Sequence, residues 1–336
     1  MIRAAIAKLI DKTDLAENET EAVMHQIMHG EATPSQIGAF LTALRMKGET
    51  VAEITGCAQA MRTNALSVTI NKEPVIDTCG TGGDSSSTFN ISTVVSLVVA
   101  GAGLAVAKHG NRSVSSSCGS ADLFEALGVK IDLGPEEAAK CIDEIGIGFL
   151  FAPRFHPAMK HAAVPRREMG IRTIFNILGP LANPASASVQ LMGVYAPELT
   201  ETMAQVLNSL GTHQAIVVHG GGIDELSTIA INKITQLTNG QITNYYLDSK
   251  ELGLAPARLE ELKGGTPQEN AKIALNLLCG EFGAKRDIVL LNAAAALVAA
   301  GKAKDFKTGM AIAAESIDNG QATKKLEQLI HLSNSL

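Results

Sequence analysis

The chain has 336 residues, of which 46% are hydrophobic and only 4% aromatic, with no tryptophan. This length favours one large or two unequal domains, and the apolar share is ample for a core. The formal net charge of -6 disfavours a nucleic-acid-binding protein, because such proteins are normally basic. An anionic substrate must therefore be attracted by a local site or a metal ion, not by the overall field.

The five cysteines are scattered and include no CxxC pair, which predicts reduced thiols in a cytoplasmic protein. The N-terminus shows no signal-peptide pattern. The longest apolar stretch, 94–107, contains glycines and is shorter than the roughly 20 residues that cross a bilayer. We therefore expect no membrane association.

The first 65 residues are predicted to be entirely helical. Three helix-start signals precede apolar residues at helical spacing, at Asn18 with Glu21, Thr33 with Gln36 and Thr50 with Glu53. They indicate three short helices joined by tight turns, with no strand between them.

From Pro74 onward, short apolar runs alternate with helical stretches, which predicts an α/β domain with a largely parallel sheet. The predicted strands cover 74–78, 104–108, 147–151, 191–195, 215–219 and 242–247. The predicted helices cover 90–101, 119–127, 135–145, 199–210, 268–279, 286–300 and 304–318. The segment 155–185, rich in Pro, Arg and His, interrupts this alternation and is a candidate to pack on the N-terminal helices.

The loop after the first predicted strand has the sequence GTGGD (80–84) and leads into a polar helix start. Glycines let the backbone approach an anion, and the unpaired N–H groups of a helix N-terminus attract it. The loop is neither a GxGxxG motif nor a P-loop, and a tight turn is the alternative. Phosphate binding is favoured by the four polar residues that crowd the helix start, where a cap needs only one: Thr88, Asn90, Ser92 and Thr93.

A second polar loop, 107–120, follows the next predicted strand and precedes a helix. Lys108 and Arg112 supply positive charge there, and the serines and backbone N–H groups supply neutral donors. Two such loops at neighbouring strand ends suit a ligand with phosphates at both ends. A solvated serine-rich loop is the alternative, but it does not explain the position at a strand end.

Asp224 and Glu225 follow a predicted buried strand and three glycines. Carboxylates beside a phosphate site would repel the ligand unless a cation lies between them, and oxygen ligands with phosphate are the usual setting for Mg²⁺. Ser92 could add a hydroxyl ligand. A solvated acidic turn is the alternative.

Either Arg166 or Arg167 could hold a carboxylate of a co-substrate through two hydrogen bonds, and a surface salt bridge is the alternative. The residues alone do not decide between carboxylate binding and a surface salt bridge. The isolated histidines are predicted to be structural, except His109, which lies within the second loop. No HExxH or Gly-x-Ser-x-Gly motif is present.

Taken together, these residues resemble the anthranilate phosphoribosyltransferase family over essentially the whole chain. The resemblance rests on GTGGD (80–84), NIST (90–93), KHGNR (108–112), the Arg166 segment through NILGPL (176–181), and Asp224 with Glu225. It implies an α/β fold with a small N-terminal all-helical domain and a larger α/β domain with a largely parallel central sheet. The helical domain would be 1–70, joined in space by part of 160–185 and used for homodimerisation, and the catalytic domain would be 71–336.

The resemblance also implies the reaction. The 5-phosphoribosyl group of phosphoribosyl pyrophosphate (PRPP) is transferred to the amine of anthranilate, pyrophosphate is released through an oxocarbenium-like transition state, and the product enters tryptophan synthesis. Two Mg²⁺ ions would be held by Ser92, Asp224 and Glu225. Anthranilate would contact Gly80, Asn111 and Arg166. No general base is assigned.

By the same resemblance, PRPP would contact both loops and the helix start. The implied contact residues are Gly80, Gly83, Asp84, Thr88, Asn90, Ile91, Ser92, Thr93, Lys108, His109, Gly110, Asn111, Arg112, Ser113, Val114, Ser115, Ser116 and Ser120.

Three alternatives are weighed against this assignment. A pyrimidine nucleoside phosphorylase has a similar fold, but its second loop is usually of the Lys-Met-Ser-Gly-Arg type and it does not need paired acids. A nucleic-acid-binding paralogue should have a basic surface and a damaged substrate loop. A Rossmann-type dehydrogenase needs a third glycine where this chain has Ser85.

Overall fold

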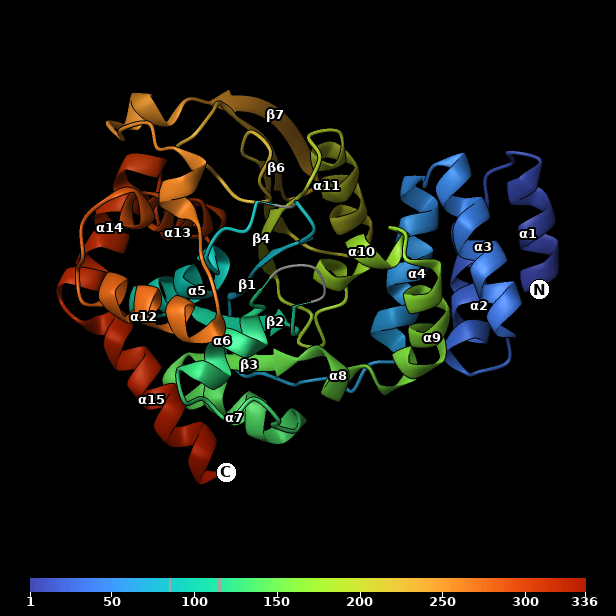
Figure 1. Cartoon of the computed structure of the whole chain (residues 1–336), viewed down its shortest axis with the longest axis horizontal. Helices are drawn as coiled ribbons and strands as arrows, with labels where there is room; N and C mark the ends of the chain where they lie inside the picture. Colours follow the sequence, from blue (N-terminus) through green and yellow to red (C-terminus); the bar gives the residue numbers. More distant parts are fainter. Residues whose placement is uncertain (85, 114–116) are drawn as a thin grey trace.

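The computed structural model describes residues 1–84, 86–113 and 117–336. A helical bundle lies at one end of the molecule and a larger α/β domain at the other, which confirms the predicted fold class (Figure 1). The bundle is built from α1 (Ile2–Ile10), α2 (Glu17–Met28), α3 (Pro34–Lys47) and α4 (Val51–Thr63). The sequence predicted three of these helices. It missed α1, whose start has no side-chain cap to mark it.

Capping boxes explain where α3 and α4 begin. The hydroxyls of Thr33 and Thr50 accept hydrogen bonds from the backbone N–H groups three residues later. The side chains of Gln36 and Glu53 accept bonds from the threonine N–H groups in return. Because these pairs satisfy otherwise unpaired donors, the short polar sequences fix both helix starts locally.

The α/β domain contains one seven-stranded sheet in the order β3-β2-β1-β4-β5-β6-β7. The strands are β1 (Val75–Gly80), β2 (Ala105–Gly110), β3 (Ile147–Phe151), β4 (Val189–Gly193), β5 (Gln214–His219), β6 (Asn232–Thr238) and β7 (Gln241–Leu247). Strands β1 to β5 are parallel to one another, so their carboxyl ends share one edge of the sheet.

The sequence analysis missed β6, which pairs antiparallel with β5 and β7. The turn between β6 and β7 is Asn239-Gly240, and both residues have positive φ angles, 50° and 84°. This is the two-residue turn typical of a β-hairpin. The signal was present in the sequence, but the polar alternation of β6 did not resemble the buried runs of the parallel strands.

Helices pack on the sheet and on one another. Apart from the helices between β3 and β4, those described after the bundle are α5 (Ile91–Gly101), α6 (Ser120–Ala126), α7 (Pro135–Ile145), α11 (Leu199–Ser209), α12 (Pro267–Leu278), α13 (Ala284–Ala299), α14 (Phe306–Asp318) and α15 (Gln321–Ser335). α5 is buried along nearly its whole length and contacts β1, α13 and α15. The sequence analysis did not predict α15.

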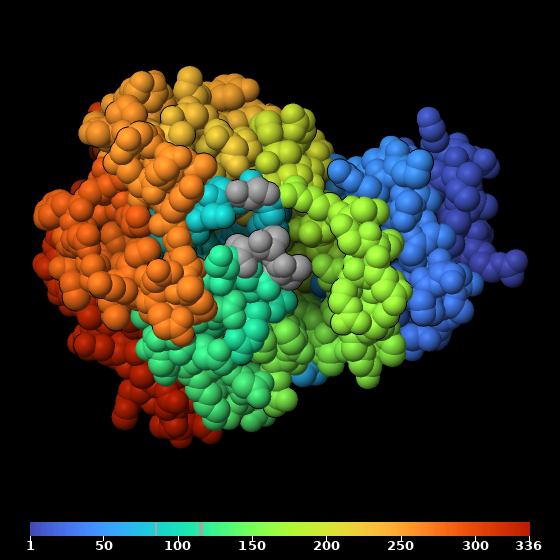
Figure 2. Space-filling model, in the orientation of Figure 1, coloured from blue at the N-terminus to red at the C-terminus, as the bar shows by residue number. Residues whose placement is uncertain are grey.

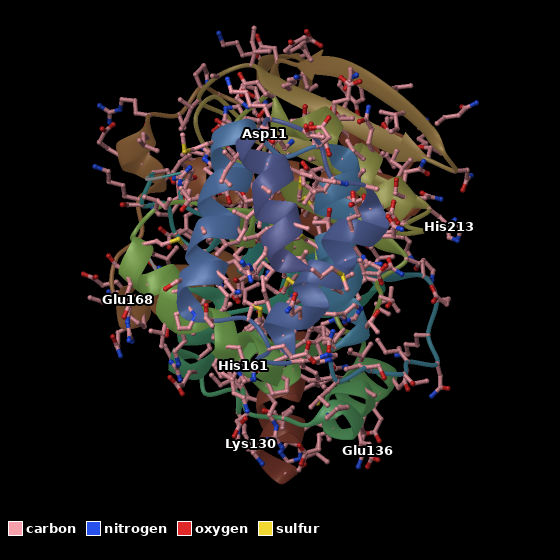
Figure 3. The ribbon with its side chains drawn as sticks, turned by 90° about the vertical axis from the view of Figure 1, so that its right-hand side faces the viewer. Asp11, Lys130, Glu136, His161, Glu168 and His213 are labelled. Carbon is pink, nitrogen blue, oxygen red and sulfur yellow. The ribbon has the colours of Figure 1, made fainter. Side chains whose placement is uncertain are left out.

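The segment between β3 and β4 contains α8 (Ala152–Phe155), α9 (Lys160–Met169) and α10 (Phe175–Leu178). α9 packs against α2 and α3, and its residues His161 and Glu168 lie beside the bundle in Figure 3. Buried residues of this segment share a hydrophobic cluster with the bundle, β4, β5 and α11. The bundle and one face of the sheet are therefore connected by continuous apolar packing.

The face of the molecule in Figure 2 is hollowed where the segments that follow β1 and β2 lie. The segment that contains α9 borders this hollow on the bundle side. Among the described residues, no helix has both the length and the apolar character needed to cross a bilayer.

Candidate active site

The glycine loop begins at Gly80, where β1 ends beside Gly193 of β4. Thr81 N–H donates to Gly193 O at 3.0 Å, which continues the strand pairing by one residue. Gly82 and Gly83 then have φ angles of 68° and 74°. Two successive residues in this region favour glycine and turn the chain sharply away from the sheet. The turn brings backbone N–H groups to the carboxyl edge of the sheet.

The two acids reach the same loop from the segment after β5. Asp224 Oδ2 accepts a 2.6 Å hydrogen bond from Gly82 N–H, and Asp224 N–H donates to Asp84 Oδ2 at 3.3 Å. Glu225 Oε1 accepts from Ser92 N–H in the first turn of α5 at 3.1 Å. The structure therefore brings together three carboxylates and Ser92, which the sequence placed on separate strand ends.

These carboxylates are short of positive charge. Burial, together with the charge of Asp84, raises the pKa of Asp224. Burial and the charge of Asp224 raise the pKa of Glu225 well above its ordinary value. Lys108 is the cation whose charge opposes this shift at Glu225. A divalent cation would supply the missing charge, so the donor set fits Mg²⁺.

A metal here could not be enclosed by the protein alone. Within the described ranges, no group of three or more His, Cys, Asp or Glu side chains forms a metal-binding cluster. Mg²⁺ commonly takes one or two carboxylates and completes its coordination with water and phosphate oxygens. The arrangement of Asp224 and Glu225 is of that kind.

Lys108 points inward from the end of β2. Its side chain is buried, and Nζ donates to Thr78 O at 2.6 Å and to Ser92 Oγ at 3.4 Å. Burial lowers the pKa of Lys108. The ammonium group therefore lies between β1 and the start of α5, where it orients the hydroxyl of Ser92.

The second loop is anchored at its start by Asp77. This buried carboxylate accepts from His109 N–H at 3.3 Å and from Asn183 Nδ2 at 2.8 Å, and burial raises its pKa to about 6. The ring of His109 lies against that of His156, tilted by 55° and with centroids 5.2 Å apart. The loop then brings Gly110 against Ser120, since a Cβ on Gly110 would lie 2.1 Å from Ser120 Oγ.

Other predicted residues of this loop have different surroundings. Ser120 Oγ donates to Asn111 O at 3.4 Å. The guanidinium group of Arg112 binds Asp122 and Glu125 at the protein surface, at 2.9 and 2.8 Å. Ser113 N–H donates to Asp122 at 3.0 Å. The predicted contacts Val114, Ser115 and Ser116 lie outside the described residues.

The start of α5 is arranged around Asn90. Its side chain makes no cap bond to the helix; instead Nδ2 donates to Cys118 O, and Oδ1 accepts from Asn270 Nδ2, both at 2.9 Å. Asn90 therefore does not cap the helix; the side chain that bonds to its first turn is Glu225, through Ser92 N–H. Of the other predicted residues, Ile91 and Thr93 are buried there, and Thr88 Oγ1 lies 3.3 Å from Ser86 Oγ.

Arg166 lies near the end of α9, with its guanidinium group 4.7 Å from the centre of the Phe175 ring. Burial lowers the pKa of Arg166. Among the described residues it forms no ion pair, whereas Arg167 is exposed on the same helix. A partly buried guanidinium group without a carboxylate partner is suited to bind an acidic ligand.

Comparison with known proteins identifies the family. A model described as "Glycosyl transferase family, helical bundle domain" matches residues 3–65, and one described as "Glycosyl transferase family, a/b domain" matches 72–323. The anthranilate phosphoribosyltransferase of Moorella thermoacetica is 56% identical over 98% of each chain, and that of Alkaliphilus metalliredigens is 54% identical over 100% of this chain and 99% of its own. The chain belongs to the anthranilate phosphoribosyltransferase family.

Solved structures of the family agree. The enzyme from Thermus thermophilus has a TM-score of 0.94 and 45% identity, covering 98% of this chain and 99% of its own. The enzyme from Saccharomyces cerevisiae, solved in complex with PRPP and Mg, has a TM-score of 0.92 and 28% identity, covering 100% and 98%. Another structure of the yeast enzyme contains 4-fluoroanthranilate.

Several residues that shape the site were not singled out by sequence analysis. Asp77 and Asn183 hold the start of the second loop, and Asn270 holds Asn90. Asn183 and Asn270 are single polar residues far along the chain from the loops that they contact. A buried asparagine carries no local pattern, so only the tertiary contacts reveal these roles.

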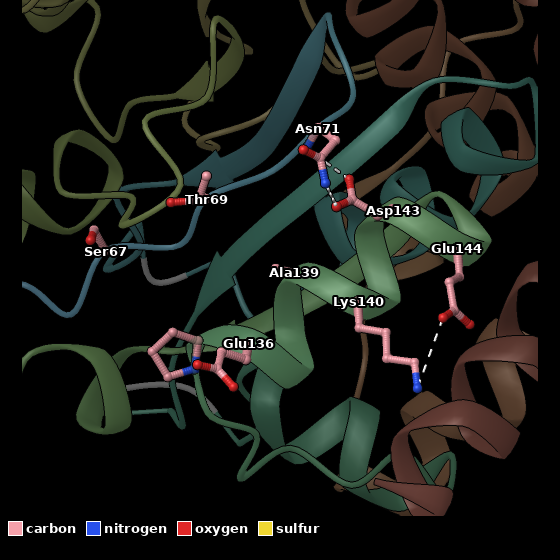
Figure 4. A pocket seen from close by; sticks show the side chains of 9 residues that line it. Ser67, Thr69, Asn71, Glu136, Ala139, Lys140, Asp143 and Glu144 are labelled. Atoms are coloured by element: carbon pink, nitrogen blue, oxygen red, sulfur yellow. Dashed lines mark hydrogen bonds and ion pairs between the residues drawn. The ribbon is translucent and has the colours of Figure 1, made fainter.

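A separate hollow of about 580 Å³ lies between the segment before β1 and helix α7 (Figure 4). Asn71 there donates two hydrogen bonds to Asp143, at 2.9 and 2.7 Å, and Lys140 lies 3.9 Å from Glu144. None of the lining residues belongs to the glycine loop, the acid cluster or the second loop. Asn71, Asp143, Lys140 and Glu144 of this hollow bind one another in pairs, and the candidate active site is elsewhere.

Proposed function

We propose that this chain transfers the 5-phosphoribosyl group from PRPP to the amine of anthranilate and releases pyrophosphate, a step of tryptophan biosynthesis. The observation that carries this assignment is the meeting of Asp224 and Glu225 with the glycine loop and the first turn of α5. Relatives that are 51–56% identical over nearly the full chain support it.

The backbone of the chain would hold the phosphate groups. The glycine loop and the second loop follow the parallel strands β1 and β2, and α5 begins after the glycine loop, so all three lie at the carboxyl edge of the sheet. The N–H groups of Gly82 and Ser92 donate to Asp224 and Glu225, so we propose that other backbone N–H groups of these segments bind the phosphates. Such donors stabilise negative charge without reorganising when the charge develops. We propose that the PRPP-contacting residues are the set implied by the family resemblance.

Mg²⁺ is used by this family, since the yeast enzyme is solved with PRPP and Mg. We propose that Ser92, Asp224 and Glu225 hold two ions here. When bound, the metal would supply positive charge at the diphosphate, which is the leaving group. The raised pKa values of both acids support this assignment, because neighbouring carboxylates are stabilised in their charged form by a cation.

Anthranilate would be oriented by its carboxylate. We propose that Arg166 binds that group, with Gly80 and Asn111 beside the ring. The aryl amine is neutral at pH 7 and becomes acidic only as the C–N bond forms, so placement matters more than deprotonation. Orientation of two substrates can lower a barrier by several kcal/mol. No side chain is assigned as a general base.

We also propose a homodimer formed through a helical domain of residues 1–70 with part of 160–185, beside a catalytic domain of 71–336. The packing of α9 on α2 and α3 supports this grouping. A cytoplasmic location stays a prediction, favoured by the absence of any disulfide between the five cysteines.

The function can be tested directly. Purified protein is mixed with PRPP, Mg²⁺ and anthranilate, and the loss of anthranilate fluorescence is followed. Uracil and adenine, each offered in place of anthranilate and followed by chromatography, are the controls. We expect anthranilate to be consumed only when PRPP and Mg²⁺ are both present. Transfer to uracil or adenine, with anthranilate left unchanged, would contradict anthranilate as the acceptor.

A further inference from the structure

Arg172 reaches the glycine loop from the bundle side of the molecule. It lies in the loop between α9 and α10, and its Cζ is 4.5 Å from the centre of the Tyr195 ring. A Cβ built on Gly83 would lie 3.0 Å from Arg172 Nη2. The guanidinium group therefore touches the turn that begins the phosphate site. Neither Arg172 nor Tyr195 is among the residues implied by the family resemblance.

The position of this side chain is held from both sides. Gly170, with a φ of 61°, ends α9, and Asn176 Oδ1 accepts from Thr173 N–H at 2.9 Å, so the loop that carries Arg172 is tied down at each end. Tyr195 N–H donates to Thr81 Oγ1 at 3.1 Å, which attaches the tyrosine to the glycine loop. The guanidinium group of Arg172 thus stacks on a tyrosine whose backbone is itself bonded to the glycine loop.

The charges around the loop explain what Arg172 can bind. Within the described part of the chain, Arg172 forms no ion pair. The carboxylate of Asp224 contacts the same turn, where it accepts from Gly82 N–H. A diphosphate on this turn would have the acid cluster with its metal as one neighbour and the guanidinium group as another. Arg166, six residues earlier, faces Phe175 instead, so the two arginines serve different places.

We propose that Arg172 contacts the diphosphate of PRPP and that Tyr195 is a positioning residue for its guanidinium group. This inference rests on the proposed function. In the reaction, the ribose C1–O bond breaks and its electron pair stays on the diphosphate, the amine nitrogen forms the new bond to C1, and its proton passes to solvent. Arg172 stabilises the charge that gathers on the diphosphate, as arginine does at other phosphate sites.

The competing explanation is a surface arginine that merely stacks on a tyrosine, a contact that contributes a little to stability and nothing to catalysis. The two explanations differ in which measurement changes. Stacking alone affects thermal stability, whereas a diphosphate contact affects PRPP binding and turnover and leaves anthranilate binding unchanged.

The test compares Arg172→Gln and Arg172→Lys with the unaltered chain. We expect Arg172→Gln to lower kcat/KM for PRPP about 30-fold or more, with the anthranilate KM changed less than about twofold. Arg172→Lys should recover part of the loss, because it keeps the charge but not the planar fork. Calorimetry with PRPP and Mg²⁺, without anthranilate, should show weaker PRPP binding by Arg172→Gln.

Substitutions at Tyr195 provide a second, independent test of the proposal. Tyr195→Phe keeps the ring and should retain kcat/KM for PRPP, whereas Tyr195→Leu should lower it, and the loss should not add to that of Arg172→Gln. Arg258→Gln is the matched control, since it removes an exposed guanidinium group from elsewhere. A change of less than about threefold in kcat/KM for PRPP on Arg172→Gln would overturn the proposal. Absence of any transfer by the unaltered chain would instead contradict the proposed function.

Discussion

Asp224 lies so close to Gly80 that a Cβ atom at position 80 would come within 2.3 Å of Asp224 Oδ2. The same oxygen accepts the 2.6 Å hydrogen bond from Gly82 N–H. The glycine at the end of β1 therefore makes room for the acid that the site requires.

Gly80→Ala should displace the Asp224 carboxylate. We expect kcat to fall about 100-fold or more, with a loss of stability of about 1–3 kcal/mol from overpacking. Steady-state kinetics and thermal unfolding measure the two effects. Gly38→Ala is the control: a Cβ there would meet only Met169 Sδ, at 3.9 Å, and alanine within α3 should stabilise the chain by about 0.5–1 kcal/mol. Normal activity of Gly80→Ala would contradict this account.

Asp224→Asn should separate stability from function. The amide keeps an oxygen for Gly82 N–H but removes a buried charge beside Asp84. We expect the Tm in EDTA to rise by about 2 °C or more, while Mg²⁺-dependent turnover is largely lost. The double variant with Glu225→Gln should lose the Mg²⁺ dependence completely. Metal-dependent turnover at the normal rate would refute the metal assignment.

Arg166→Ala should act on anthranilate alone. Loss of a charged hydrogen-bond pair should raise the KM for anthranilate about 30-fold, with the KM for PRPP changed less than about threefold. The same change at the exposed Arg167 should alter neither. Equal effects of Arg166→Ala on both substrates would show that it does not bind the acceptor carboxylate.

His156 should make the fold sensitive to mild acid. Burial lowers the pKa of His156 to about 4. The unfolded chain, with a pKa of about 6.5 at this residue, then binds more protons than the folded chain between these values, so stability falls as the pH drops through this window.

His156→Asn should remove this contribution. Urea unfolding at pH 7 and at pH 5 should show the variant losing about 2 kcal/mol less on acidification than the unaltered chain. Burial and the charge of His156 lower the pKa of His109 to about 3, so the folded His109 is neutral at both pH 7 and pH 5 and contributes nearly equally in the two proteins. Equal losses in the two proteins would mean that His156 is not held neutral by the fold.

Asn183→Leu should weaken the junction between the second loop and the segment before β4. Asn183 Nδ2 donates to Asp77 Oδ2 and to Ala107 O, both at 2.8 Å and both buried. Leaving these acceptors unpaired should reduce the free energy of unfolding by about 2–4 kcal/mol, which urea titration measures. Leu275→Ala, a change on the exposed side of α12, serves as the control and should have a small effect.

Much of the fold could be predicted because its signals are local. Thr33 with Gln36, and Thr50 with Glu53, satisfy helix N-termini within one turn, and the buried runs of the parallel strands stand out against the helices between them. The strand β6 was missed because its polar alternation suits only an antiparallel hairpin, and α1 because no cap residue marks its start. The start of α1 therefore carries no local signal, whereas the Asn239-Gly240 turn beside β6 was a local signal that the analysis did not use.

The sequence by itself determined which segments end in a site: glycines, a polar helix start and paired acids each follow a strand. Only the tertiary structure decided which of them meet. Gly82 and Asp224 are 142 residues apart, and their contact depends on β1 and β5 both lying beside β4. The inward direction of Lys108 and the reach of Arg172 to the glycine loop likewise depend on neighbours from distant segments. Local patterns report the bonds that a segment makes with itself, whereas sheet order and packing determine which distant side chains come within bonding distance.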